Sequence, residues 1–193
     1  MGRFFYWLAN FFWYKVGGWK VASGLPKGLK KAVIAAAPHT SKEDFPVGTG
    51  AWYPENKKAS FIAKKELFDG PMGFILKAMG GIAIDRATTK NMVEQVADSF
   101  RQSEELFLVI APEGTREWKP RWKTGFYYMA KSAGVPLILA YMDFAKKEVG
   151  MGHVFYPTDD EAADFKYIEE FYSKVTAKYP EKYNPKMTEA PAS

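Results

Sequence analysis

The amino-acid sequence predicts an α/β domain whose mostly parallel or mixed sheet is covered by helices. Short apolar runs alternate with segments of helical spacing, an alternation that is typical of this class. The clearest strand is Leu106–Ile110, because five consecutive apolar residues favour a strand that is buried on both faces. A second apolar run, 32–37, ends at Pro38, which has no N–H group to continue a strand ladder. The 193 residues suit one domain with a substantial core.

The other elements follow from the same patterns. Apolar runs predict further strands at 59–63, 82–84 and 137–141 and an edge strand at 154–156, and helical spacing predicts helices at 72–79, 89–101, 124–133 and 164–178. The stretch 46–52 fits either a helix or a loop. Beyond Pro180 the chain is polar and is expected to be a mobile tail. The expected division is therefore an N-terminal helix and loop (1–28), one domain (29–180) and a tail (181–193).

Composition excludes several kinds of site. The chain has no cysteine, so a disulfide, a thiolate nucleophile and a zinc–thiolate site are impossible. It has two histidines, His39 and His153, which excludes a site built from many histidines, and no metal is expected. The lack of disulfides, and of a convincing signal cleavage site, favours a cytoplasmic protein. The net charge is +5, and seven basic residues precede the first acidic one, Glu43. A basic end of this kind suits nucleic acid, an anionic membrane or an anionic substrate.

The N-terminus is unusually rich in aromatic residues. Nine of the first 20 residues are aromatic. As a helix, 4–14 would be about 16 Å long, too short for a hydrocarbon core of about 30 Å. Aromatic rings beside basic residues favour the membrane–water interface, so we expect an amphipathic interfacial helix. A helix packed on the protein's own core is the alternative, and contiguous aromatics argue against nucleic-acid binding. The expected membrane-contacting residues are Phe4, Trp7, Phe11, Phe12 and Trp13.

One segment combines a strand end with residues that can do chemistry. His39 follows the run 32–37, and Asp44 lies five residues further on. A strand-to-helix turn can bring imidazole and carboxylate together, and such a carboxylate fixes the tautomer and makes the other ring nitrogen a better base. By itself the spacing favours a surface histidine beside a helix-capping aspartate.

Three further motifs follow His39 and Asp44 in order: GGIAIDR at 80–86, PEGTR at 112–116 and VPLI at 135–138. This set resembles the glycerolipid acyltransferase family, which contains the lysophosphatidic acid and glycerol-3-phosphate acyltransferases, over roughly the central half of the chain. The sequence departs from the family pattern at Pro38, where asparagine is common, and at Ala111, Glu117 and Leu139. Those departures lie at the motif ends.

The resemblance implies roles for individual residues. His39 is the expected general base and Asp44 its orienting partner. Lys64, which follows a strand, is a candidate for oxyanion or phosphate binding, with a solvated lysine as the alternative. Val135 and Pro136 are candidates for the acyl pocket, with a core strand as the alternative. The expected acceptor- and phosphate-binding residues are Arg86, Glu113, Gly114, Thr115 and Arg116. Glu113 alternatively serves as a buried ion-pair partner.

The implied function is a membrane-associated O-acyltransferase without a cofactor. It would move a fatty acyl group from acyl-CoA or acyl carrier protein to the hydroxyl of a lysophosphatidate-like acceptor. It would act at the cytoplasmic face of a membrane, as a peripheral or monotopic protein. Two alternatives stay open: an acyltransferase for another lysolipid, and a non-catalytic lipid-binding protein on the same fold. The sequence leaves the oligomeric state open.

Overall fold

The computed structural model describes residues 10–52, 57–70, 73–85, 87 and 91–187. A seven-stranded sheet forms the centre of the described chain, with strand order β1-β7-β6-β2-β5-β3-β4. All neighbouring pairs are parallel except β6 and β7, so the sheet is mixed, as the sequence predicted. The strands are β1 (Lys20–Ser23), β2 (Lys31–Ala37), β3 (Ala59–Lys64), β4 (Gly81–Ile84), β5 (Leu106–Ile110), β6 (Leu137–Asp143) and β7 (Glu148–Phe155).

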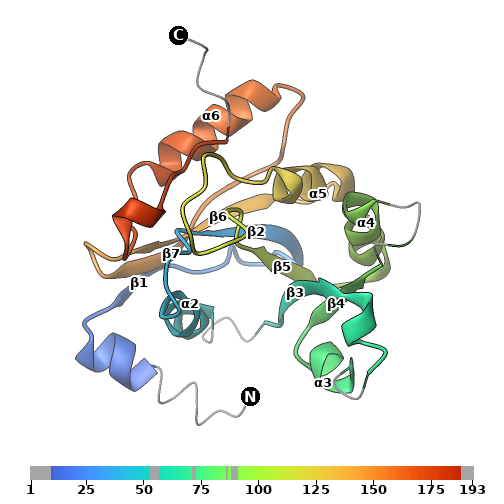
Figure 1. Cartoon of the computed structure of the whole chain (residues 1–193), viewed down its shortest axis with the longest axis horizontal. Coiled ribbons are helices and arrows are strands. Elements are labelled where there is room, and N and C mark those ends of the chain that lie inside the picture. Colours follow the sequence, from blue (N-terminus) through green and yellow to red (C-terminus); the bar gives the residue numbers. More distant parts are fainter. Residues whose placement is uncertain (1–9, 53–56, 71–72, 86, 88–90, 188–193) are drawn as a thin grey trace.

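Helices cover both faces of this sheet (Figure 1). On one face lie α4 (Met92–Gln102), α5 (Gly125–Ala133) and α6 (Glu161–Tyr172). On the other lie α2 (Asp44–Trp52), α3 (Gly73–Ala78) and the short π-helix η1 (Asn10–Val16). Two single-turn helices, η3 (Lys65–Leu67) and η4 (Pro180–Lys182), lie in connections. None of the helices in the described ranges has the length and hydropathy needed to cross a bilayer.

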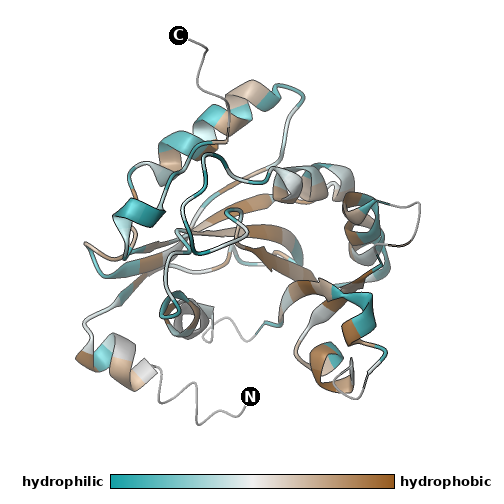
Figure 2. Cartoon of the chain, viewed as in Figure 1, coloured by the Kyte–Doolittle hydropathy of each residue, from teal (hydrophilic) through white to brown (hydrophobic). Residues whose placement is uncertain are grey.

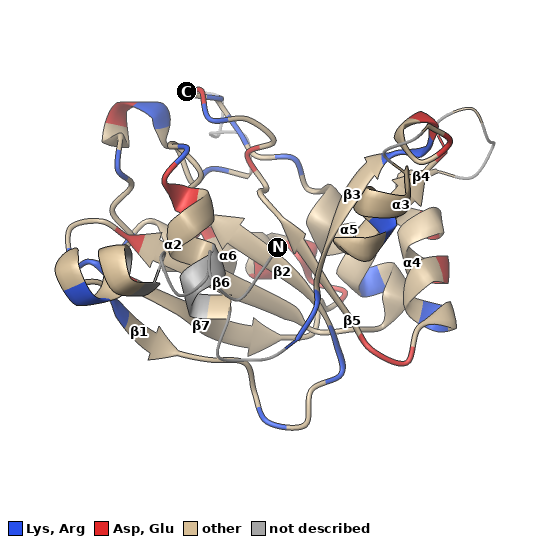
Figure 3. Ribbon diagram, turned by 90° about the horizontal axis from the view of Figure 1, so that it is seen from below, with Lys and Arg blue, Asp and Glu red and all other residues tan. Residues whose placement is uncertain are grey.

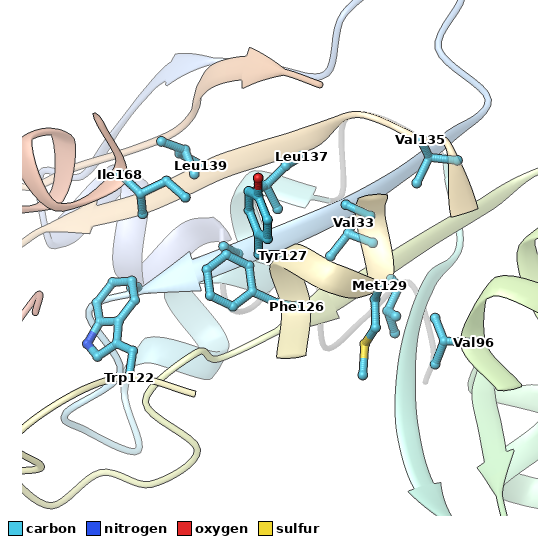
Figure 4. Close-up of a cluster of buried hydrophobic side chains, with 14 of the residues drawn as sticks. Val33, Val96, Trp122, Phe126, Tyr127, Met129, Val135, Leu137, Leu139 and Ile168 are labelled. Carbon is cyan, nitrogen blue, oxygen red and sulfur yellow. The ribbon is translucent and has the colours of Figure 1, made fainter. Parts of the chain in front are cut away.

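Strand β2 is the centre of the sheet because it pairs with both β5 and β6. Its alternate residues belong to two separate cores. Val33 and Ala35 join the larger core with Phe126 of α5, which Figure 4 shows between sheet and helix. Ile34 joins a smaller core with Trp52 of α2 on the opposite face. Burial on both faces explains why this strand is apolar from residue 32 to residue 37.

The structure corrects several sequence-based expectations at the chain ends. Strand β1 was not predicted, yet it pairs with β7, so the folded domain begins before residue 29. Strand β7 is longer than predicted and lies between β1 and β6 instead of forming an edge. Residues 181–187 are not a free tail, since Met187 is buried and its N–H donates to Glu169 Oε1 at 2.6 Å. Residues 188–193 lie outside the described chain.

The N-terminal aromatic residues divide into two groups. Trp19 is 6% exposed and packs edge-to-face on Phe144 with ring centroids 4.9 Å apart. Tyr14 donates its hydroxyl proton to the Val47 carbonyl at 2.7 Å. These two side chains therefore belong to the domain. Phe11 and Phe12 are exposed on η1, whereas Phe4, Trp7 and the Trp13 side chain lie outside the described part of the structure.

Candidate active site

The carboxyl ends of the parallel strands β2, β3, β4 and β5 meet at one edge of the sheet. Open α/β sheets bind their ligands at this edge. The segments that follow β2 and β5 carry His39 and Glu113, and β3 ends at Lys64. The topology therefore gathers residues that lie far apart in the sequence.

His39 and Asp44 form a pair across the turn from β2 into α2. The distance from His39 Nδ1 to Asp44 Oδ2 is 3.2 Å, and the imidazole is 31% exposed while the carboxylate is 1% exposed. Asp44 Oδ2 also accepts the Ser41 N–H at 2.8 Å, which fixes the carboxylate at the start of α2. The predicted pairing of these two side chains is thus present, with the far ring nitrogen left for solvent or substrate.

Glu113 joins the loop after β5 to the histidine. Its Oε1 accepts the backbone N–H of His39 at 2.8 Å, and its Oε2 is buried without a hydrogen-bond partner among the described residues. Burial raises the pKa of the Glu113 carboxyl to about 7. Glu113 is therefore next to the histidine backbone, a contact that the spacing of the motifs did not reveal.

Gly114 has a conformation that side chains rarely adopt, with φ at +67°. An added Cβ would lie 3.3 Å from Cε of Lys123, so a side chain at this position would also crowd that lysine. The backbone N–H of Lys123 donates to the carbonyl oxygen of Pro112 at 3.0 Å. Glycine is therefore required for the PEGTR loop to close against Lys123.

The cationic candidates are less defined. Arg116 and Lys64 are exposed, and Arg86 lies outside the described residues. Thr115 Oγ1 accepts the N–H of Glu117 at 3.2 Å, which leaves its hydroxyl proton available. The structure therefore brings His39, Asp44 and Glu113 together without fixing where the arginine side chains act.

An apolar cavity of about 600 Å³ opens beside His39 on the α2 face of the sheet. Its lining comes from β2, α2, β5, β6, β7, the start of β3 and the end of α3, and is predominantly apolar. Representative lining residues are Ile34, Ala36, Trp52, Val109, Ala140 and Met151. The sequence did not single out these residues, because an apolar run looks the same whether it faces a core or a cavity.

The two acyl-pocket candidates lie elsewhere. Val135 is buried in the larger core on the α5 face, and the Pro136 carbonyl accepts the N–H of Val33 at 3.1 Å. Neither residue lines the cavity. Both residues directly precede β6 and are buried, close to the core alternative that the sequence left open.

Within the described residues, no group of histidine and carboxylate side chains is arranged to hold a metal ion. The reactive groups at this edge are the His39–Asp44 pair, which lines the apolar cavity, and the buried Glu113 carboxyl group, which is bonded to the histidine backbone. Such a set can activate a hydroxyl next to a bound hydrocarbon chain.

Comparisons with known proteins show which fold and which family the chain shares. The chain is similar in structure to the 1-acyl-sn-glycerophosphate (LPA) acyltransferase PlsC from Thermotoga maritima, with a TM-score of 0.57 and 19% identity over 86% of this chain and 76% of that one. No curated protein matches the sequence. The model of the Acyltransferase family matches residues 20–142, more than half of the chain, from β1 to near the end of β6. The chain is therefore a member of the Acyltransferase family.

Proposed function

We propose that this acyltransferase moves a fatty acyl group from a CoA or carrier-protein thioester to the hydroxyl of a lysophosphatidate-like acceptor. The observation that carries the proposal is the placement of the His39–Asp44 pair at an apolar cavity of about 600 Å³. The name of the similar Thermotoga maritima enzyme supports the choice of acceptor. The enzyme would work as a peripheral or monotopic protein at the cytoplasmic face of a membrane, and a chain without cysteine suits that reducing compartment.

In the proposed mechanism, His39 activates the acceptor directly. The Asp44 carboxylate faces Nδ1 and favours the tautomer that keeps its proton on Nδ1, so Nε2 is left as the base. Nε2 takes the proton from the acceptor hydroxyl while that oxygen attacks the thioester carbonyl carbon. The tetrahedral intermediate then collapses, the carbon–sulfur bond breaks, and the imidazolium returns its proton to the departing thiolate. No acyl-enzyme forms in this sequence.

The basic residues at the same edge suit the acceptor phosphate and the developing oxyanion. Lys64 is at the end of β3, and Arg116 is in the loop that follows β5. In the sequence, Asp85 directly follows β4, and Arg86 comes next. An arginine fork binds phosphate through two charge-assisted hydrogen bonds. We assign Arg86 and Arg116 to the phosphate and Lys64 to either anionic group.

Glu113 should make the stability of the fold depend on pH. A carboxyl group whose pKa rises from 4.5 to about 7 on folding stabilises the fold below pH 4.5, and that stabilisation is lost as the pH rises through 7. The loss is on the order of 3 kcal/mol by pH 8. Glu113→Gln keeps an oxygen for the His39 N–H and removes the titration. Urea unfolding at pH 5 and pH 8 should show a smaller decrease in stability for Glu113→Gln than for the wild type. Identical decreases would contradict the assignment.

The exposed aromatic residues of η1 should contribute to membrane binding. Phe11→Ser/Phe12→Ser removes two exposed rings and leaves Tyr14 and Trp19 in place. Because burying a phenylalanine side chain contributes about 1.5–3 kcal/mol, binding to anionic vesicles should fall by about tenfold or more. Vesicle sedimentation measures this, with Val21→Ser, an exposed position on β1, as the control. Equal sedimentation of the double variant and the wild type would exclude the η1 contact.

A product assay separates the proposed function from its alternatives. The protein is incubated with labelled acyl-CoA or acyl carrier protein and a panel of lysolipids, and the lipids are then identified by mass spectrometry. We expect acylated product from lysophosphatidate in preference to acceptors without a terminal phosphate. A preference for another lysolipid would change the acceptor. Binding of lipid without any acyl transfer would favour the non-catalytic alternative.

A further inference from the structure

Helix α3 has the reverse of the usual surface pattern. Its residues Phe74, Ile75, Ala78 and Met79, the last directly after the helix, are exposed, and Gly73 is buried. Phe74 is 79% exposed, the highest fraction among the large apolar side chains of the described residues. A helix on a water-facing surface normally presents polar residues outward. Figure 2 shows α3 as a strongly hydrophobic segment at the edge of the molecule.

The apolar surface of α3 continues into the apolar cavity beside His39. Ala78 and Met79 line the cavity, and Met79 is exposed as well. On the α2 side, Phe45 has the same double position, since it lines the cavity and is exposed. The cavity therefore has two exposed apolar side chains in its lining, Phe45 on α2 and Met79 directly after α3. Leu67, exposed in η3, extends the apolar surface next to α3.

Basic residues border this surface. The Lys58 Nζ donates to the Lys77 carbonyl at 3.1 Å, which places two exposed lysine residues side by side where α3 meets the start of β3. Lys57, another cavity residue, forms an ion pair with Glu105. Viewed from this side, basic positions also occur along η1 and β1 (Figure 3). Acidic residues are present too, since Glu66 and Asp69 lie in the connection from β3 to α3.

We propose that α3, through Phe74, Ile75 and Met79, is a second membrane-contacting element that docks the cavity mouth on an anionic phospholipid bilayer. Both η1 and α3 lie on the same side of the sheet (Figure 1). Apolar side chains enter the boundary between headgroups and acyl chains, and the neighbouring lysines attract anionic headgroups. An acyl chain can then pass between bilayer and cavity without crossing water. The inference rests on the proposed function, because that function takes the acceptor from a membrane. The contact between α3 and the bilayer does not itself require catalysis.

The absence of cysteine from the chain permits a direct test. Phe74→Cys is labelled with an environment-sensitive fluorophore and mixed with vesicles of phosphatidylglycerol and phosphatidylcholine. Tyr156→Cys is the matched control, because Tyr156 is 62% exposed and lies outside both the site and α3. We expect a blue shift on vesicles for the label at position 74 and none for the label at position 156. A label at position 74 that stays in water while the protein binds vesicles would overturn the proposal. A shift that grows with protein concentration without vesicles would also overturn it, in favour of contact with a second copy.

A second variant measures the contribution of α3 to binding. Phe74→Ser/Ile75→Ser should lower vesicle binding by about tenfold or more, since two exposed apolar side chains no longer enter the bilayer. Tyr156→Ser should bind as the wild type does. Salt should weaken wild-type binding only in part, because the apolar contribution is not screened. Unchanged binding of the folded double variant would contradict the proposal. Because binding is measured without substrate, a failed acyl-transfer assay would reject the proposed function and leave this result standing.

Discussion

His39→Ala should lower the rate of acyl transfer by about 10²–10⁴-fold, the usual contribution of a general base. The imidazole lines the cavity and lies beside a buried carboxylate, with Nδ1 of His39 3.2 Å from Oδ2 of Asp44. Without it, the acceptor hydroxyl must lose its proton to water. The rate is measured as thiol released from acyl-CoA in the presence of lysophosphatidate.

The other histidine provides a matched control for this variant. His153 is exposed, and its ring packs against Tyr167 and Phe171, away from the site. His153→Ala should therefore keep the wild-type rate. Thermal melting shows that each variant is folded. A folded His39→Ala variant with a rate near that of the wild type would remove His39 from the mechanism.

Arg116→Ala and Arg86→Ala should raise the KM for a phosphate-bearing acceptor by roughly 10–150-fold, since a charge-assisted hydrogen bond contributes about 1.5–3 kcal/mol. The KM for the acyl donor should change less. Arg→Lys at either position should restore binding only in part, because an ammonium group lacks the planar fork. Steady-state kinetics with each substrate varied in turn measure both constants.

Arg101→Ala is a suitable comparison for these variants. Arg101 lies on α4, is exposed and pairs with Asp98 one turn earlier. Its loss should leave both KM values unchanged. If the KM for the acceptor stays constant in both Arg86→Ala and Arg116→Ala, the phosphate is bound by other residues.

The sequence was informative where chemistry depends on residue type and on strand order. Strands β2 and β5 appear as apolar runs because each is buried on both faces, and their positions agree with the prediction. The pairing of His39 with Asp44 followed from a strand that stops and a helix that starts, and α2 does begin at Asp44. Both inferences depend on local patterns.

What depends on tertiary packing was not predictable. The four residues of β1 are an exposed strand with no apolar pattern, so only their pairing with β7 defines them. Trp19 shares its aromatic character with Phe11, but one is buried and the other exposed. The contact between Glu113 and the His39 N–H joins groups 74 residues apart, and no spacing rule reports it.

The sequence likewise did not show which apolar residues line the cavity, and Val135 and Pro136 do not. Val135, just before β6, and Ile34 of β2 are both apolar, and nothing in the sequence tells which face of the sheet holds a core and which holds a cavity. The exposed apolar face of α3 is likewise invisible in a helical pattern, because periodicity identifies an apolar side but not the direction in which it points.

The central claim, direct transfer of an acyl group from a thioester to a lysophospholipid at His39, is tested most directly by a rapid-quench experiment that follows both lipid and protein. The wild-type enzyme is mixed with labelled acyl-CoA, with or without lysophosphatidate, and both the lipids and the intact protein are analysed by mass spectrometry. The mechanism predicts acylated phospholipid only when the acceptor is present, and a protein of unchanged mass throughout. An acylated protein that forms with the donor alone and then passes its acyl group to the lipid would contradict it.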